Sequence, residues 1–136
     1  MTESEYNFAE LPFYLDFLVK DDVRGRLVSL EFSKLPFQVK RYFAISVNDT
    51  NLTRGSHAHK TCWQAFFVCQ GSLTVEIRNL SFISSFKLMA DKVLIIPPYN
   101  WCEVTFETND SVMGVLASQS YDQTDYIIAH PPLQQK

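Results

Sequence analysis

The chain has 136 residues, of which 46% are hydrophobic, 14% aromatic and 20% charged. This length and composition are typical of one folded domain and exclude a disordered or low-complexity chain. The formal net charge of −3 provides no basic field for a nucleic-acid backbone, so an anionic ligand would have to meet a local group of arginines.

Strand signals dominate the chain, because β-branched and aromatic residues recur in short runs separated by polar turns. A strand-like apolar stretch at 11–19 is a candidate for crossing to a partner subunit. Loops are expected at 19–26 and 46–56. The other expected strands are 27–32, 39–45, 65–69, 73–77, 82–88, 93–96, 104–106 and 112–117.

So many short strands in one chain indicate two packed sheets or a barrel, since an open sheet of this size would leave faces and edges uncovered. We therefore expect an all-β protein with a single domain over residues 1–136. Its core is expected at about 11–128, and the tail 129–136 is expected to be loose.

The three cysteines, Cys62, Cys69 and Cys102, have no CxxC spacing, which argues against a disulfide framework and favours a reducing compartment. The first ten residues are acidic and polar, unlike a secretory signal, and no apolar run approaches the roughly 18 to 20 residues that span a bilayer. We expect a cytoplasmic protein without membrane or nucleic-acid partners.

Two of the three histidines, His57 and His59, lie two positions apart. In a strand, residues i and i+2 point to the same face, so both imidazoles would project together. The spacing predicts a site at this position. The alternatives are an exposed polar pair or a histidine hydrogen-bonded in the core.

The stretch from Arg54 to Gly71 resembles the first motif of the cupin superfamily, in which H-x-H precedes a further ligand position and a glycine turn. More narrowly, the chain resembles the WxcM-like, FdtA-type sugar-nucleotide 3,4-ketoisomerases, which act on dTDP-4-keto-6-deoxyglucose. The blocks that carry this resemblance appear in family order and are DVRGRL at 22–27, PFQVKR at 36–41, RGSHAHK at 54–60, Gly71-Ser72, WCE at 101–103, LAS at 116–118 and YDQTDYI at 121–127.

The resemblance implies a cupin-type jelly roll that forms a homodimer and moves a keto group from C4 to C3 of the sugar without a metal or redox cofactor. The product would feed synthesis of an amino-deoxy sugar for a surface polysaccharide. Such a shift passes through an enediol, so a base must remove the C3 proton and an acid must deliver one at C4. His57 and His59 suit both tasks near neutral pH, without an assignment of which is which.

The remaining expected site residues would bind the nucleotide-sugar. Arginines are natural partners of the diphosphate or of the developing enolate, and Tyr99 or Trp101 would offer a flat surface to the base. The full set of expected substrate-binding residues is Arg24, Arg41, Arg54, Gln64, Tyr99, Trp101, Cys102 and Glu103.

Several positions depart from the family pattern. Cys102 stands where a histidine is usual, Phe43 and Ala44 stand where a tyrosine pair is common, and Ile128 stands where arginine is common. These departures leave open a noncatalytic or substrate-shifted nucleotide-sugar-binding protein.

Metal is a further alternative, since two histidines and the thiolate of Cys102 are ligands that zinc accepts. A neutral amide at Gln64, where cupin metal sites have a carboxylate, is a poor ligand, so we expect no metal.

Overall fold

Alternation of apolar and polar residues builds the strands that face the core. In β7 (Leu73–Arg78), Leu73, Val75 and Ile77 are fully buried, whereas the polar residues between them are only partly buried. This period of two is what a strand with one covered face requires. The structure, a computed structural model, describes residues 4–132.

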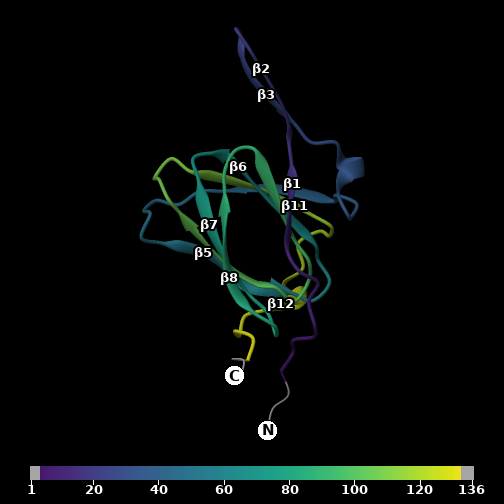
Figure 1. Cartoon of the computed structure of the whole chain (residues 1–136). Helices are drawn as coiled ribbons and strands as arrows, with labels where there is room; N and C mark the ends of the chain where they lie inside the picture. The colour runs from purple at the N-terminus through teal and green to yellow at the C-terminus, as the bar shows by residue number, and fades with distance from the viewer. Residues whose placement is uncertain (1–3, 133–136) are drawn as a thin grey trace.

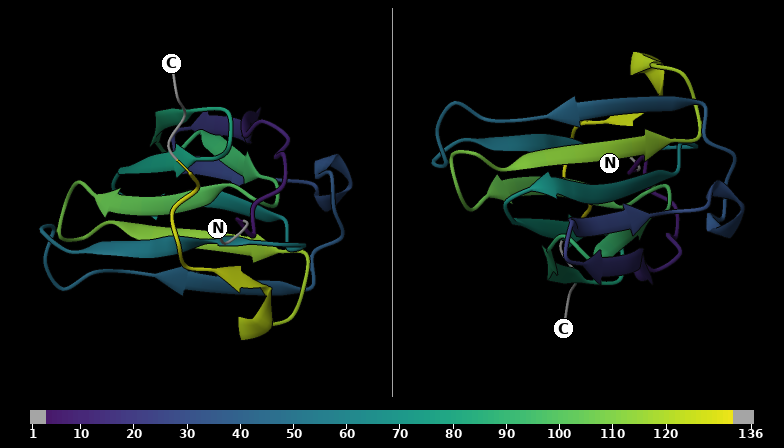
Figure 2. Two further views of the ribbon diagram at one scale, coloured as in Figure 1. Left: turned by 90° about the horizontal axis from the view of Figure 1, so that it is seen from below. Right: turned by 90° about the horizontal axis from the view of Figure 1, so that it is seen from above.

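The strands form two antiparallel five-stranded sheets that face each other (Figures 1 and 2). One sheet has the order β1-β9-β6-β11-β4, from Phe13–Asp16, Lys92–Ile96, Gln64–Gln70, Val112–Ala117 and Arg41–Ile45. The other has the order β12-β5-β10-β7-β8, from Tyr126–Ile127, Thr53–His59, Trp101–Phe106, Leu73–Arg78 and Ile83–Leu88. The expected all-β jelly roll is therefore confirmed.

Three apolar clusters pack the two sheets against each other and against the segments that cover their outer faces. The largest lies between the sheets and includes Phe66, Val104 and Val115. A second covers the outer face of the β9-β6-β11 sheet, and a third, around Trp101 and Tyr6, covers the outer face of the other sheet. Both sheets thus bury residues on two faces, which explains the continuous apolar run of β9.

A hairpin of β2 (Leu18–Asp22) and β3 (Gly25–Ser29) projects from the body of the molecule (Figure 1). The expectation of a loop at 19–26 was wrong. The sequence signal is weak here because both strands are mostly exposed, so no buried face imposes an alternating pattern. The expected loop at 46–56 is also shorter than predicted, since β5 already begins at Thr53.

Both ends of the described chain pack on the second sheet. The Tyr6 hydroxyl donates a hydrogen bond of 2.6 Å to the carbonyl of Ala129, and the His130 ring lies 4.4 Å from the ring of Trp101. The first part of the tail expected to be loose is therefore anchored, and residues 133–136 lie outside the described residues. At the other end, β1 pairs with β9 of its own chain.

Two short 3-10 turns, η1 (Phe32–Lys34) and η2 (Gln123–Asp125), interrupt the strands. Within residues 4–132, no helix has the length and apolar character needed to cross a membrane.

Candidate active site

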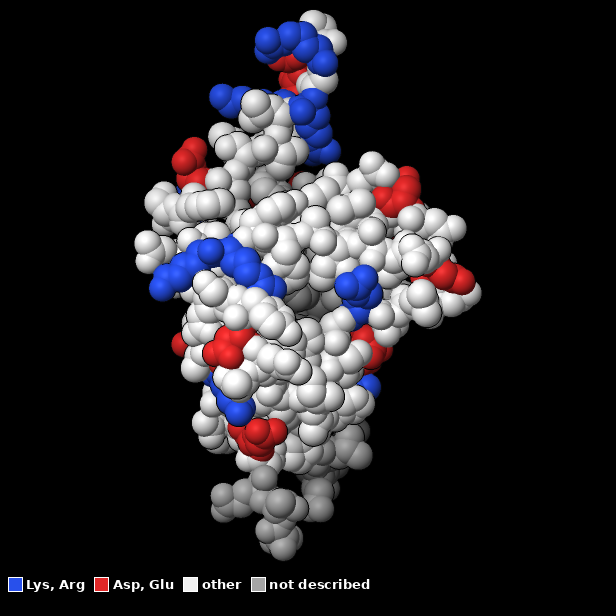
Figure 3. Space-filling view, turned by 180° about the vertical axis from the view of Figure 1, so that it is seen from behind, with Lys and Arg blue, Asp and Glu red and all other residues white. Residues whose placement is uncertain are grey.

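A cavity of about 540 Å³ lies between the two sheets. Its polar lining consists of Arg41, Arg54, His57, Gln64 and Tyr126, and its apolar lining includes Phe43, Ile45, Phe66, Val104, Met113 and Val115. Figure 3 shows a hollow in one face of the molecule with basic side chains on two sides. A concave site with few convergent polar groups is typical of a small-molecule pocket.

A β-bulge in β5 directs two functional side chains into this cavity. His57 is paired with Cys102 and Gly55 with Glu103, so Ser56 is the extra residue on this strand. Gly55 and Ser56 have φ values of +95° and +61°, and a Cβ on Gly55 would lie 3.0 Å from the carbonyl oxygen of Cys102. Without the bulge, side chains three positions apart would face opposite sides, but Arg54 and His57 both line the cavity.

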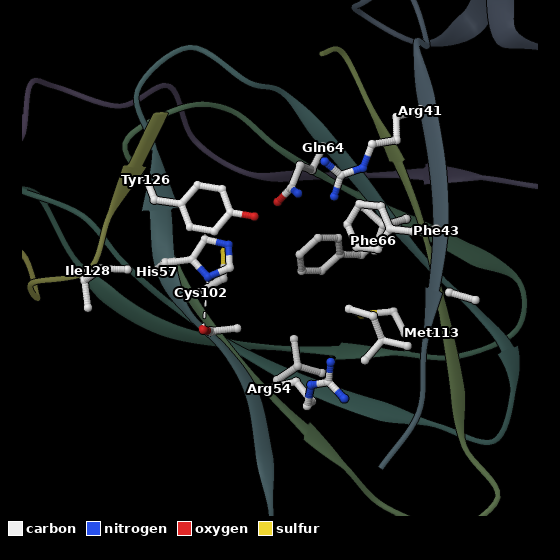
Figure 4. Close-up of a pocket in the computed structure, with 15 residues that line it drawn as sticks. Arg41, Phe43, Arg54, His57, Gln64, Phe66, Cys102, Met113, Tyr126 and Ile128 are labelled. Atoms are coloured by element: carbon white, nitrogen blue, oxygen red, sulfur yellow. Dashed lines mark hydrogen bonds between the residues drawn. The ribbon is translucent and has the colours of Figure 1, made fainter. Parts of the chain in front are cut away.

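The tautomer of His57 follows from its hydrogen bond. Its Nδ1 lies 3.0 Å from the carbonyl oxygen of Gly55, which can only accept, so Nδ1 carries the proton. The Nε2 lone pair is left free, and Figure 4 shows this nitrogen on the cavity side of the ring. Burial lowers the pKa of His57, opposed by the bond to Gly55, so the imidazole is a neutral base at pH 7.

His59 lies beside His57 on the same face of β5, as the spacing predicted, with ring centroids 5.1 Å apart. However, it lines a small adjoining hollow, not the main cavity. Its Nδ1 lies 3.1 Å from Asp125 Oδ2, and its buried Nε2 has no hydrogen-bond partner within the described structure. Burial, followed by the neighbouring His57, lowers the pKa of His59 to about 4 against the opposing effect of Asp125.

Asp125 is a buried carboxylate with several donors. Besides His59, it accepts hydrogen bonds from the Thr61 amide and hydroxyl at 2.9 and 2.7 Å, and from the Cys62 amide at 3.1 Å. These contacts fix the carboxylate, which in turn fixes the orientation and tautomer of His59.

Tyr126 enters the cavity from β12, a strand of only two residues that pairs with β5. Its ring stacks on His57 with a centroid distance of 4.2 Å and an interplanar angle of 8°. It also contacts the His59 ring edge-on at 4.7 Å. One phenol therefore touches both imidazoles.

Two of the expected arginines line the cavity on different sides (Figure 4). The Arg41 guanidinium lies 4.3 Å from the ring centroid of Phe43, on the side of Gln64 and Tyr126. Arg54 donates a hydrogen bond of 3.0 Å to the Ser46 carbonyl and lies across the cavity from Arg41. The cavity thus offers two separate positive groups to an anionic ligand.

Strand alternation separates the three residues of the 101–103 block. Cys102 lines the cavity, whereas Trp101 packs in the outer cluster and Glu103 accepts a 2.9 Å hydrogen bond from Ser56. Residues on either side of an inward-pointing residue face outward, so the three cannot share one site. Burial raises the pKa of the Cys102 thiol, which donates to the Asn100 carbonyl at 3.4 Å.

Two more expected site residues also lie away from the cavity. Tyr99 packs in the outer cluster, where its hydroxyl accepts a hydrogen bond from Asn7. Arg24 lies at the exposed tip of the projecting hairpin and is paired with Asp22 at 2.7 Å. Arg24 was expected in the site because its block, 22–27, resembles the family. The sequence predicted a loop there and did not reveal a hairpin that carries Arg24 away from the histidines.

In the described part of the chain, no three His, Cys, Asp or Glu side chains are grouped so that they could hold a metal ion. The zinc alternative needs the Cys102 thiolate beside two histidines. The thiol is buried with a raised pKa and His59 faces Asp125, so this ligand set is not assembled.

Asp125 and Tyr126 were not singled out from the sequence as functional residues. Both belong to the 121–127 block, which carried part of the family resemblance. The signal was therefore present, but the pairing of this block with β5 is a long-range contact that sequence spacing does not reveal.

The FdtA family model, described as WxcM-like, C-terminal, matches residues 6–131. The chain belongs to this family. A TDP-4-oxo-6-deoxy-alpha-D-glucose-3,4-oxoisomerase from Aneurinibacillus thermoaerophilus is 39% identical to this chain over 108 residues, or 78% of each chain.

Solved structures of similar proteins have the same fold. The sugar 3,4-ketoisomerase QdtA from Thermoanaerobacterium thermosaccharolyticum, in complex with TDP, has a TM-score of 0.82 and 32% identity, covering 87% of this chain and 88% of its own. The TDP-quinovose 3,4-ketoisomerase WlaRB from Campylobacter jejuni has a TM-score of 0.80 and 31% identity, covering 87% and 92%. A histidine-to-asparagine variant of QdtA was solved with TDP-4-keto-6-deoxyglucose.

Proposed function

We propose that this protein is a TDP-4-keto-6-deoxyhexose 3,4-ketoisomerase. One observation carries the proposal: in a chain of the FdtA family, a neutral histidine with a free Nε2 faces a cavity flanked by two arginines. The relatives at 31% identity or more that are described above are named as 3,4-oxo- or 3,4-ketoisomerases.

In the first step His57 Nε2 removes the proton from C3 of the sugar. The electrons of the C3–H bond form the C3–C4 double bond, and the keto oxygen gains the charge of an enolate. A lowered pKa keeps His57 unprotonated at neutral pH, which a base requires. In the second step the imidazolium of His57 returns a proton to C4, leaving the carbonyl at C3.

His59 is a positioning residue in this scheme. Its ring lies against His57 and Tyr126, and Asp125 holds its Nδ1 proton. A neutral imidazole at this position leaves His57 free to take up positive charge without repulsion from a second cation. The structure therefore favours unequal roles for the two histidines, which the sequence left unassigned.

We assign the diphosphate to the side of the cavity that carries Arg54. A guanidinium binds phosphate oxygens through two parallel hydrogen bonds. The hydrogen bond from Arg54 to the Ser46 carbonyl fixes the orientation of this guanidinium. Arg41 and Gln64, on the side of Tyr126, are then positioned for the sugar.

We propose that the protein works as a homodimer. The hairpin of β2 and β3 leaves Val23, Leu27 and Leu18 106%, 56% and 55% exposed. An isolated hairpin is marginally stable in water, so packing of this apolar surface on a second copy would stabilise it. Light scattering of the purified protein should give twice the mass of one chain, and a monomer at all concentrations would contradict this.

We also propose a cytoplasmic location and a role in making an amino-deoxy sugar for a surface polysaccharide, since a nucleotide-linked 3-keto sugar is a substrate suited to amination at C3. A purified sample incubated with TDP-4-keto-6-deoxyglucose should form the 3-keto isomer, detected by NMR of the sugar ring. Binding of this substrate without conversion would support the noncatalytic alternative suggested by Cys102 and Phe43.

A further inference from the structure

A keto shift moves protons on oxygen as well as on carbon. His57 accounts for the protons on C3 and C4, but the C4 oxygen must gain a proton and the C3 oxygen must lose one. The group that does this has to touch both neighbouring oxygens and must lie beside the base.

Within the described structure, fifteen residues line the cavity, and Tyr126 is the one that carries a hydroxyl group. Phe43 and Ala44, at positions where a tyrosine pair is common in the family, bring no hydroxyl to the opposite wall. The other neutral donor with an acidic proton, the Cys102 thiol, is buried and donates to the Asn100 carbonyl.

The surroundings of Tyr126 suit a proton-transferring phenol. Its ring is held parallel to His57 at 4.2 Å, so a sugar carbon at His57 Nε2 would have its oxygen near the phenol. Figure 4 shows the hydroxyl directed across the cavity toward Gln64 and Arg41. The Arg41 guanidinium lines the same cavity and lowers the pKa of this phenol, so it can stabilise a phenolate.

From this geometry we infer that Tyr126 is a catalytic residue that gives a proton to the C4 oxygen and takes one from the C3 oxygen. The inference rests on the proposed ketoisomerase function and deepens it. Arg41 is then a positioning residue that stabilises the transient phenolate.

The protons balance without any further reactant. In the first half, the C3–H bond breaks toward His57, the C3–C4 double bond forms, and the C4 oxygen takes the Tyr126 proton. In the second half, the phenolate removes the proton from the C3 hydroxyl, the C3 carbonyl forms, and C4 takes the proton from His57. Both residues end in their starting states.

The protonation state of Tyr126 agrees with this role. Burial raises the pKa of the phenol, and Arg41 opposes the rise. The free enzyme therefore holds a neutral phenol at pH 7, ready to donate, and the guanidinium lowers the cost of the phenolate that follows.

The test is a Tyr126→Phe variant assayed with TDP-4-keto-6-deoxyglucose. Phenylalanine keeps the ring stacked on His57 and removes only the hydroxyl, so a purely packing role predicts an unchanged rate. We expect kcat to fall about 10²- to 10³-fold, within the usual range for a lost acid–base group, with KM changed less than about threefold.

Tyr121→Phe is the matched control. The ring centroid of Tyr121 lies 5.3 Å from the guanidinium carbon of Arg41, but Tyr121 is 64% exposed and does not line the cavity. We expect this variant to keep kcat within about twofold of the wild type, since the hydroxyl it loses does not reach the sugar. Thermal unfolding of both variants checks that they are folded.

The outcomes separate the inference from the proposed function. A wild-type protein that converts the substrate, with an equally active Tyr126→Phe variant, would overturn the inference alone. An equal loss of kcat in the Tyr121 control would also overturn it, because the effect would not be specific to the cavity. A wild-type protein that leaves the substrate unconverted would overturn the proposed function and this inference with it.

Discussion

The two walls of the cavity differ in chemistry although both are antiparallel sheets. On one wall, β5 and β12 bring His57 and Tyr126 together with Arg54. On the other, β4 and β11 present mainly apolar side chains, and Arg41 is the first residue of β4. The irregular wall, with its bulge and its two-residue strand, carries the side chains proposed to be catalytic, and the regular wall shapes the cavity.

This difference shows how the chain retains a ketoisomerase site despite its departures from the family pattern. The altered positions Phe43 and Ala44 lie on the apolar wall, and Cys102 lies beside His57 on β10. The histidines, Asp125 and Tyr126 form one connected group on the opposite wall. Cys102 and Ile128 lie on the same wall as this group, which stays assembled despite both changes.

The largest effect is expected from His57→Asn. Asparagine keeps a polar side chain but cannot accept the C3 proton, so kcat should fall about 10³-fold or more. Steady-state kinetics with TDP-4-keto-6-deoxyglucose measures this. His130→Asn, which alters a histidine packed on Trp101 outside the cavity, is the control and should retain activity. A rate within tenfold of the wild type for His57→Asn would contradict its role as the base.

A smaller effect is expected from Arg54→Gln. Losing one charge-assisted contact with the diphosphate should raise KM about tenfold with little change in kcat, and should weaken TDP binding by the same factor. Titration calorimetry with TDP measures the binding. Lys87→Gln, which removes an exposed cation paired with Glu107, is the control. Unchanged TDP affinity in Arg54→Gln would move the diphosphate away from this wall.

The pH dependence of stability tests the buried histidine. The pKa of His59 is lowered to about 4 in the folded chain, so only the unfolded chain binds this proton between about pH 6.5 and 4. Above pH 6.5 His59 is neutral in both states, so its protonation does not reduce stability. As the pH falls, proton binding by the unfolded chain lowers the free energy of unfolding. The free energy of unfolding should therefore decrease by up to about 3 kcal/mol over this window.

Urea unfolding at several pH values measures this change, and His59→Asn should show a flatter dependence than the wild type. Equal slopes for the two proteins would mean that His59 is protonated as readily in the folded chain as in the unfolded one.

The smallest effect is expected from Phe43→Tyr, which places a hydroxyl on the apolar wall. If Tyr126 already transfers the protons on oxygen, kcat should change less than about threefold. In the Tyr126→Phe background, the same substitution tests whether a phenol on the opposite wall can replace the missing one. A gain of more than tenfold in the otherwise wild-type protein would show that the present site lacks an oxygen-directed acid.

The fold was predictable because most strands have a buried face that imposes alternation, as in β7. The β2-β3 hairpin was missed because its exposed strands have no such constraint. Local spacing predicted that His57 and His59 share a face of β5, whereas their catalytic roles came from the family resemblance. Tyr126 required knowledge that β12 pairs with β5, and the outward direction of Trp101 required the position of Cys102 in β10.

The central claim is that His57 removes and returns protons on the sugar carbons in a ketoisomerase reaction. The most direct measurement is NMR of TDP-4-keto-6-deoxyglucose incubated in deuterated water with the wild type and with His57→Asn. The account predicts that the wild type forms the 3-keto product, and that the variant shows neither product nor exchange at C3. Equal conversion by both proteins, or no product with the wild type, would contradict it.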